Sequence, residues 1–169
     1  MHLFCLEKTG FANRYAVVSE EDLLLLDFQS DTLEEDLDRI LEYLPEPRRV
    51  WLLQTRPDAA LSAARERLQC LLPDAESLDP GYDLTALTPW RFSGHLLNIL
   101  PMGNEHWAFA LADWLFLGAV RDARGRWCGD DLGRKILTRQ GALRRRLWAF
   151  PATAEKVVDL AALRALRAA

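Results

Sequence analysis

The stretch "DTLEEDLDRILEYLPEPRRVWLLQ", residues 31–54, predicts a helix that is followed directly by a buried strand. Thr32 and Glu35 have the spacing of a capping box at the start of the helix. Apolar residues then recur at the spacing of one helix face: Leu33, Leu37, Ile40, Leu41 and Leu44. Two prolines end this helix, and the short apolar run Arg49–Gln54 is typical of a central strand.

Strand patterns precede this unit, and a second helix follows it. His2–Glu7, Arg14–Ser19 and Asp22–Phe28 are separated by polar residues and predict a three-stranded meander. The four consecutive leucines of the third segment leave a buried helical turn open as an alternative. Pro57 opens the second helix and Pro73 closes it. A meander followed by helix, strand and helix indicates an α+β fold on one mixed sheet.

The second half of the chain has a different pattern. Glu105–Leu117 is apolar on nearly every face, which predicts a buried helix, although a strand pair is the alternative because Trp and Phe favour strands. Beyond it we expect a hairpin with its tip at residues 122–125, a helix from Asp130 or Asp131 to Gln140, a strand at Arg144–Phe150 and a final helix at Ala154–Arg167. The second half would therefore add an apolar helix, hairpin, helix, strand and C-terminal helix.

Length and charge suggest a single domain over residues 1–169. A chain of 169 residues with half of them apolar can bury one core and is not disordered. A polar loop at about residues 73–89 separates an acidic first half from a basic second half: residues 1–85 carry a net charge of −10, and residues 86–169 carry +6. No apolar run is long enough to span a bilayer, and no secretory signal is visible. We expect a cytoplasmic protein without a membrane partner.

The cysteines and histidines indicate neither a disulfide framework nor a zinc site. The three cysteines, Cys5, Cys70 and Cys128, are odd in number and far apart in the sequence. Zinc sites usually contain closely spaced Cys or His pairs, and this sequence has none. The sequence therefore predicts no metal and no cofactor, and it offers no residues that we can name as catalytic.

An arginine-rich segment is the strongest candidate for a binding surface. It includes "RGRWCGDDLGRK", residues 124–135. The candidate binding residues are the cations and two tryptophans of this region: Arg121, Arg124, Arg126, Trp127, Arg134, Lys135, Arg144, Arg145, Arg146 and Trp148. Arginine and tryptophan are enriched at protein interfaces, but they also bind phosphates and single-stranded nucleic acid. A tie between the basic and acidic halves is a third possibility.

Part of the same segment resembles a cofactor loop. Arg126-Trp-Cys-Gly129-Asp-Asp131 resembles the R-x-x-G-x-G/A loop that holds the pyrophosphate of acetyl-CoA in GNAT acetyltransferases. This resemblance implies an acyl-CoA-dependent acetyltransferase. Asp131 stands where that family has a small residue, so the match is incomplete.

Our first interpretation from the sequence is a non-catalytic accessory protein. The chain contains six tryptophans, five of them in the basic half, so contacts of this half with another protein explain the sequence without a catalytic site. Binding of nucleic acid or a phosphate ligand through residues 121–146 is one alternative. The acetyltransferase-like enzyme is the other, and the oligomeric state stays open.

Overall fold

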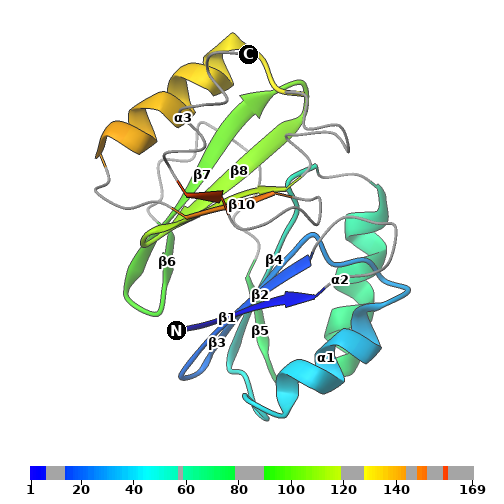
Figure 1. Ribbon diagram of the computed structural model, residues 1–169. Coiled ribbons are helices and arrows are strands. Elements are labelled where there is room, and N and C mark those ends of the chain that lie inside the picture. The colour runs from blue at the N-terminus through cyan, green and yellow to red at the C-terminus, as the bar shows by residue number, and fades with distance from the viewer. Residues whose placement is uncertain are drawn as a thin grey trace.

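The computed structural model describes residues 1–6, 14–56, 59–78, 90–118, 128–143, 148–151 and 158–159. Two β-sheets face each other, and helices cover the outer face of each sheet (Figure 1). This arrangement confirms the α+β class. It corrects the single mixed sheet, because the strands of the described residues form two separate sheets, one with five strands and one with six.

The first sheet has the strand order β1-β2-β3-β4-β5. Its strands are β1 (His2–Leu6), β2 (Arg14–Ser19), β3 (Asp22–Leu26), β4 (Arg49–Leu53) and β5 (Glu76–Leu78). The first three strands form an antiparallel meander, while β4 lies parallel to both β3 and β5. Parallel neighbours need crossover connections, and these are α1 (Leu33–Leu41) and α2 (Ala59–Leu71).

The second sheet has the order β11-β10-β9-β8-β7-β6. Its strands are β6 (Trp90–Phe92), β7 (His95–Gly103), β8 (His106–Leu111), β9 (Trp114–Gly118), β10 (Trp148–Pro151) and β11 (Val158–Asp159). Strands β9 and β10 are parallel, and α3 (Asp131–Leu143) lies between them in the sequence. The other neighbours in this sheet are antiparallel.

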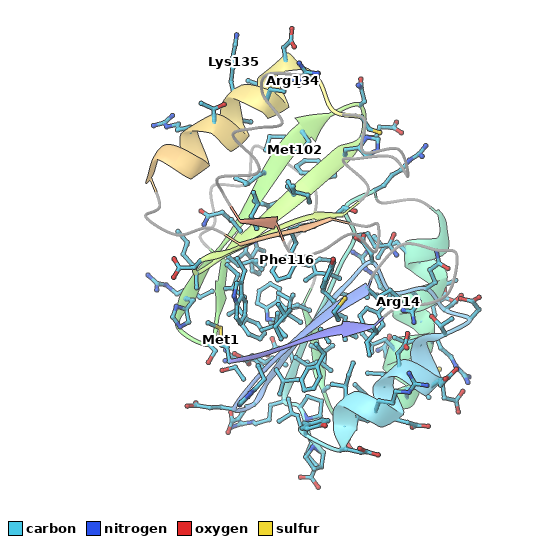
Figure 2. All side chains as sticks on the ribbon, viewed as in Figure 1. Met1, Arg14, Met102, Phe116, Arg134 and Lys135 are labelled. Atoms are coloured by element: carbon cyan, nitrogen blue, oxygen red, sulfur yellow. The ribbon has the colours of Figure 1, made fainter. Side chains whose placement is uncertain are left out.

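The core has three apolar layers. In the leucine run of β3, Leu23 and Leu25 pack under α1 and α2, whereas Leu24 and Leu26 face the second sheet. Phe116 lies in the layer between the sheets, and Met102 lies under α3 (Figure 2). Each fully buried leucine or phenylalanine contributes about 1.5–3 kcal/mol, so the layer between the sheets holds them firmly together.

The predicted apolar helix at residues 105–117 is wrong. These residues form β8 and β9, which are the strand pair that the sequence left as an alternative. Large side chains such as Phe109 face the first sheet, and small ones such as Ala108 and Ala110 face α3. Both faces of β8 are buried, so the strand has no polar face and loses the alternating pattern by which strands are recognised.

Three further details differ from the expectations. Thr32 precedes α1, but its side chain makes no capping hydrogen bond. Val158–Asp159 is a strand within the segment where a final helix was predicted. The hairpin tip at residues 122–125 and the basic residues 144–147 lie outside the described residues. Across the described ranges, every helix is too short or too polar to cross a lipid bilayer.

Candidate functional site

Two polar residues meet where β3 and β4 end. Because these strands are parallel, their carboxyl ends lie at the same edge of the sheet, and Asp27 and Thr55 come just beyond them. The Thr55 backbone N–H donates to Asp27 Oδ1 over 2.7 Å. The Thr55 Oγ1 atom lies 2.9 Å from each oxygen of the same carboxyl group. Asp27 has a φ of 60°, a left-handed conformation that Asp and Asn adopt more readily than most residues.

Burial changes the acidity of Asp27. Desolvation raises the pKa of this carboxyl group to about 6, although the hydrogen bonds from Thr55 act in the opposite direction. The ionised form is therefore costly at neutral pH. Strongly perturbed carboxyl groups are found more often at functional sites than elsewhere.

The second sheet reaches the same edge through β8. The Trp107 N–H donates to the Thr55 carbonyl oxygen over 2.7 Å. Next to it, His106 Nδ1 lies 2.6 Å from the backbone oxygen of Asn104. A carbonyl oxygen can only accept, so Nδ1 carries the proton, and in the neutral imidazole Nε2 keeps its lone pair. The β7–β8 turn thus fixes the tautomer of His106.

The start of α3 completes this edge. The Asp130 N–H donates to the Met102 carbonyl oxygen, and Asp130 Oδ1 accepts from the Gly133 N–H over 2.8 Å, which caps the helix. The Asn104 side-chain amide donates to the Cys128 carbonyl oxygen over 3.0 Å. A Cβ at Gly103 would overlap the Asp130 carboxylate, so only glycine allows this close packing. Six residues form what we call the strand-end site: Asp27, Thr55, Asn104, His106, Cys128 and Asp130.

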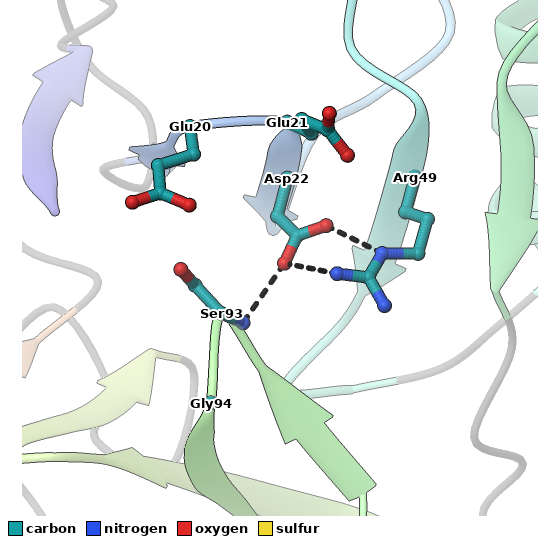
Figure 3. Close-up of a pocket in the computed structure, with 6 residues that line it drawn as sticks. All are labelled: Glu20, Glu21, Asp22, Arg49, Ser93 and Gly94. Atoms are coloured by element: carbon teal, nitrogen blue, oxygen red, sulfur yellow. Dashed lines mark hydrogen bonds and ion pairs between the residues drawn. The ribbon is translucent and has the colours of Figure 1, made fainter.

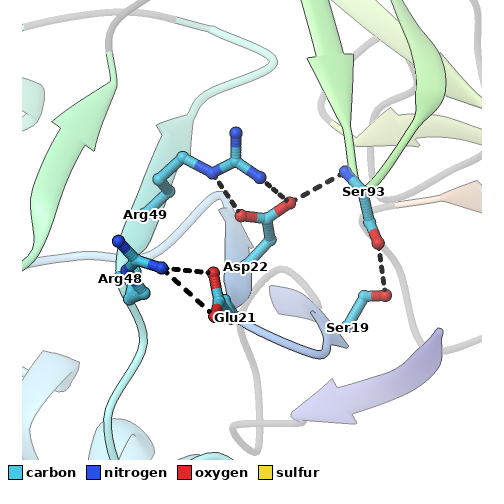
Figure 4. A network of polar contacts seen from close by, with 6 residues as sticks. All are labelled: Ser19, Glu21, Asp22, Arg48, Arg49 and Ser93. Atoms are coloured by element: carbon cyan, nitrogen blue, oxygen red, sulfur yellow. Dashed lines mark hydrogen bonds and ion pairs between the residues drawn. The ribbon is translucent and has the colours of Figure 1, made fainter.

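A second polar cluster lies at the opposite ends of β3 and β4. Asp22 accepts hydrogen bonds from the Arg49 guanidinium over 2.6 and 2.9 Å and from the Ser93 N–H over 2.8 Å (Figure 4). Ser19 Oγ also donates to Ser93 Oγ. A cavity of about 280 Å³ lies beside these groups, with Glu20 at its edge (Figure 3). We call this cluster the sheet clamp, because its hydrogen bonds join the two sheets.

The structure describes only some of the candidate binding residues that the sequence predicted. Arg134 and Lys135 are exposed on α3 and point away from the body of the protein (Figure 2). Trp148 belongs to β10, where its backbone is paired with Trp114 of β9. Seven of the candidates lie outside the described residues: Arg121, Arg124, Arg126, Trp127, Arg144, Arg145 and Arg146. Binding of a partner protein or nucleic acid by this segment stays a prediction.

The strand-end site was missed in the sequence, although a signal for it exists. Asp27 and Thr55 each lie at the end of an apolar run that was predicted to be a strand. In open α/β sheets, ligands bind beyond the carboxyl ends of parallel strands. Without the pairing of β3 with β4, however, nothing in the sequence brings these two residues together.

No protein-family model matches this chain, and no curated protein does. Its structure is similar to that of ETHE1 from Myxococcus xanthus, with a TM-score of 0.68, 19% identity and coverage of 95% of this chain and 80% of that one. It is also similar to a metallo-β-lactamase from Pontibacter korlensis, with a TM-score of 0.62, 15% identity and coverage of 99% and 92%. The chain has the metallo-β-lactamase fold.

A third solved structure supports this assignment. TMB-1, which was studied for substrate and inhibitor binding, has a TM-score of 0.61 and 11% identity, with coverage of 99% of this chain and 90% of that one. Our interpretation as a non-catalytic accessory protein is therefore contradicted, because the proteins that share this fold include hydrolytic enzymes. The acetyltransferase alternative finds no support among them either.

The fold raises the question of a metal, since one of these proteins is named as a metallo-β-lactamase. Metal sites in proteins need three or four ligands from His, Cys, Asp or Glu that converge on one point. Among the residues that the structure describes, no group of three such side chains could hold an ion. The strand-end site does not fit a metal, and we derive no reaction step through one.

Proposed function

We propose that this chain is a hydrolase that cleaves an ester- or amide-type bond of a small organic substrate at the strand-end site, with His106 as the general base. The observation that carries the proposal is the geometry of His106. Its Nδ1 atom is held 2.6 Å from the Asn104 oxygen, which leaves Nε2 to accept a proton. The ring is partly exposed, so water and a substrate can reach it.

The chemistry needs one proton acceptor beside the substrate carbonyl. A water molecule transfers a proton to His106 Nε2 while its oxygen forms a bond to the carbonyl carbon. The imidazolium then returns the proton to the leaving group as the bond to that group breaks. Such a base typically contributes a factor of about 10² to 10⁴ in rate.

The fold supports the reaction class. The metallo-β-lactamase from Pontibacter korlensis, whose name describes hydrolysis of a cyclic amide, spans almost the same length as this chain. The polar groups of the strand-end site come from both sheets and from the start of α3, so a substrate there would contact three elements.

The test uses a substitution that removes Nε2 and keeps the hydrogen bond. In His106→Asn the side-chain amide can still donate to the Asn104 oxygen, but no proton acceptor replaces Nε2. His95→Asn is the matched control, because His95 is an exposed histidine at the other end of β7. Both variants and the parent protein are assayed with chromogenic esters, thioesters and β-lactams.

We expect turnover by the parent and by His95→Asn, and a loss of about 10²-fold or more in kcat for His106→Asn. The melting temperatures of the three proteins should agree closely, because both histidines are partly or fully exposed. Equal turnover by His106→Asn and the parent would exclude His106 as the base. Absence of turnover on every substrate class would contradict the proposed function.

A further inference from the structure

The nitrogen and sulfur ligands that this chain can offer are few. The sequence contains three histidines and three cysteines, and all six lie within the described part of the chain. His2 and Cys5 lie on β1, and Cys70 lies on the exposed side of α2. His95 lies next to the turn between β6 and β7, at the sheet-clamp end. Four of the six therefore belong to other parts of the fold.

The remaining pair, His106 and Cys128, belongs to the strand-end site. His106 uses Nδ1 for the Asn104 oxygen and has only Nε2 left for a ligand. Cys128 is half-buried. It lies at the same edge, since its carbonyl oxygen accepts a hydrogen bond from the Asn104 side chain. Within the described ranges these two do not join a third ligand to form a group that could hold an ion.

The carboxylates of the strand-end site are already engaged. Both oxygens of Asp27 lie within hydrogen-bond distance of Thr55. Asp130 caps α3 and packs against Gly103. A metal bound by these carboxylates would have to displace the hydrogen bonds from Thr55 to Asp27 and the cap that Asp130 forms on α3.

From this donor set we infer that the chain is a metal-independent form of the metallo-β-lactamase fold. In place of metal ligands, the strand-end site has the hydrogen bonds that Thr55 donates to Asp27 within the first sheet. The Trp107 N–H, which donates to the Thr55 carbonyl oxygen, connects the two sheets. Hydrogen bonds within the protein thus hold the strand ends together without a metal ion. The inference concerns metal content and holds whether or not the chain is a hydrolase.

The experiment measures metal content, affinity and stability on the full chain after removal of any histidine tag. Protein expressed in medium with added zinc, iron and manganese is dialysed against metal-free buffer, and its metals are measured by mass spectrometry. Zn²⁺ is then titrated into the protein in competition with a chromogenic chelator. The melting temperature is recorded with Zn²⁺ and with EDTA.

We expect less than about 0.1 metal ion per chain, no micromolar competition for Zn²⁺, and a melting temperature that changes by less than about 1 °C with either addition. About one equivalent of any metal that survives dialysis, together with a melting temperature lowered by EDTA, would overturn the inference. His106→Asn and Cys128→Ser, with His95→Asn as control, would then locate the ion. Turnover by metal-free protein is a separate readout, so failure of the hydrolase proposal and failure of this inference are distinguishable.

Discussion

The substitution Asp27→Asn should stabilise this protein above pH 6, although it removes a charged residue from the candidate site. The pKa of the Asp27 carboxyl group is raised from 3.8 to about 6, so between these values the folded state binds a proton that the unfolded state has released. The contribution of Asp27 to the free energy of unfolding of the parent therefore falls as the pH rises from about 4 to 6 and then levels off. Asn does not titrate and lacks this loss.

The size of the effect follows from the shift. The shift of about two pKa units corresponds to about 3 kcal/mol, at 1.36 kcal/mol per unit. We therefore expect the free energy of unfolding of Asp27→Asn, measured relative to the parent, to be about 3 kcal/mol higher at pH 7.5 than at pH 4. The geometry allows the exchange, because Asn tolerates the left-handed backbone. Its oxygen can accept from the Thr55 N–H and hydroxyl, while its amide can donate to the Thr55 hydroxyl oxygen.

The assay is urea unfolding of the parent and Asp27→Asn at several pH values from 4 to 8. Asp38→Asn is the control, since Asp38 is exposed on α1. In thermal unfolding, the gain at pH 7.5 should appear as a rise of about 6–12 °C in melting temperature for a chain of this length. A difference between Asp27→Asn and the parent that is the same at pH 4 and pH 7.5 would refute the reasoning, and so would destabilisation that grows with pH.

Three further predictions test other parts of the fold. Asp36→Asn should destabilise the protein by about 3–5 kcal/mol in urea unfolding, because it leaves the buried Arg14 charge without its ion-pair partner; a loss below about 1 kcal/mol would contradict this. Gly103→Ala should lower the free energy of unfolding by about 1–3 kcal/mol, since the new methyl group overlaps Asp130 and the φ of residue 103 is 78°. Amide hydrogen exchange in α3 should become faster, and unchanged exchange would show that the packing adjusts. Val50–Leu53 should exchange among the slowest amides, as β4 lies inside the sheet and is buried; rapid exchange there would contradict the assignment.

Local patterns allowed part of the fold to be predicted from the sequence. The α1 helix has one apolar face and a polar opposite face, and Leu33, Leu37 and Ile40 are buried while Glu34 and Glu35 are exposed. This contrast is visible in the sequence because the helix lies on the surface of the protein. Strand β4 was visible because its short apolar run lies between proline turns.

The division into two sheets could not be predicted, because strand pairing is not encoded in a local pattern. In β8 the side chains alternate between two buried layers, so Trp107, Ala108 and Phe109 are all apolar although they point in opposite directions. Periodicity reports the contrast between buried and exposed faces and is lost when both faces are buried. Side-chain size still alternates, and large residues face the layer between the sheets.

The candidate site was less predictable than the fold, because its residues are joined by long-range pairing. Asp27 and Thr55 are 28 positions apart and are brought together by the parallel pairing of β3 with β4. Asn104 and Cys128 meet only when the start of α3 packs on β7. The arginine-rich segment was predicted to be a binding surface because its residues are close in sequence. Closeness in sequence does not establish closeness in the fold.

The free-energy cost of ionising Asp27 distinguishes the strand-end site from the sheet clamp. Asp22 in the clamp is buried more completely than Asp27, but the Arg49 guanidinium compensates its charge through two hydrogen bonds. Among the described residues, the donors to the Asp27 carboxyl group are the neutral N–H and hydroxyl of Thr55, so its ionised form remains unfavourable by about 3 kcal/mol at neutral pH. Asparagine would keep the hydrogen bonds without this penalty, so packing and stability do not explain an aspartate at this position. A carboxyl group with a raised pKa at the edge that holds His106 matches the kind of group that is found more often at functional sites than elsewhere.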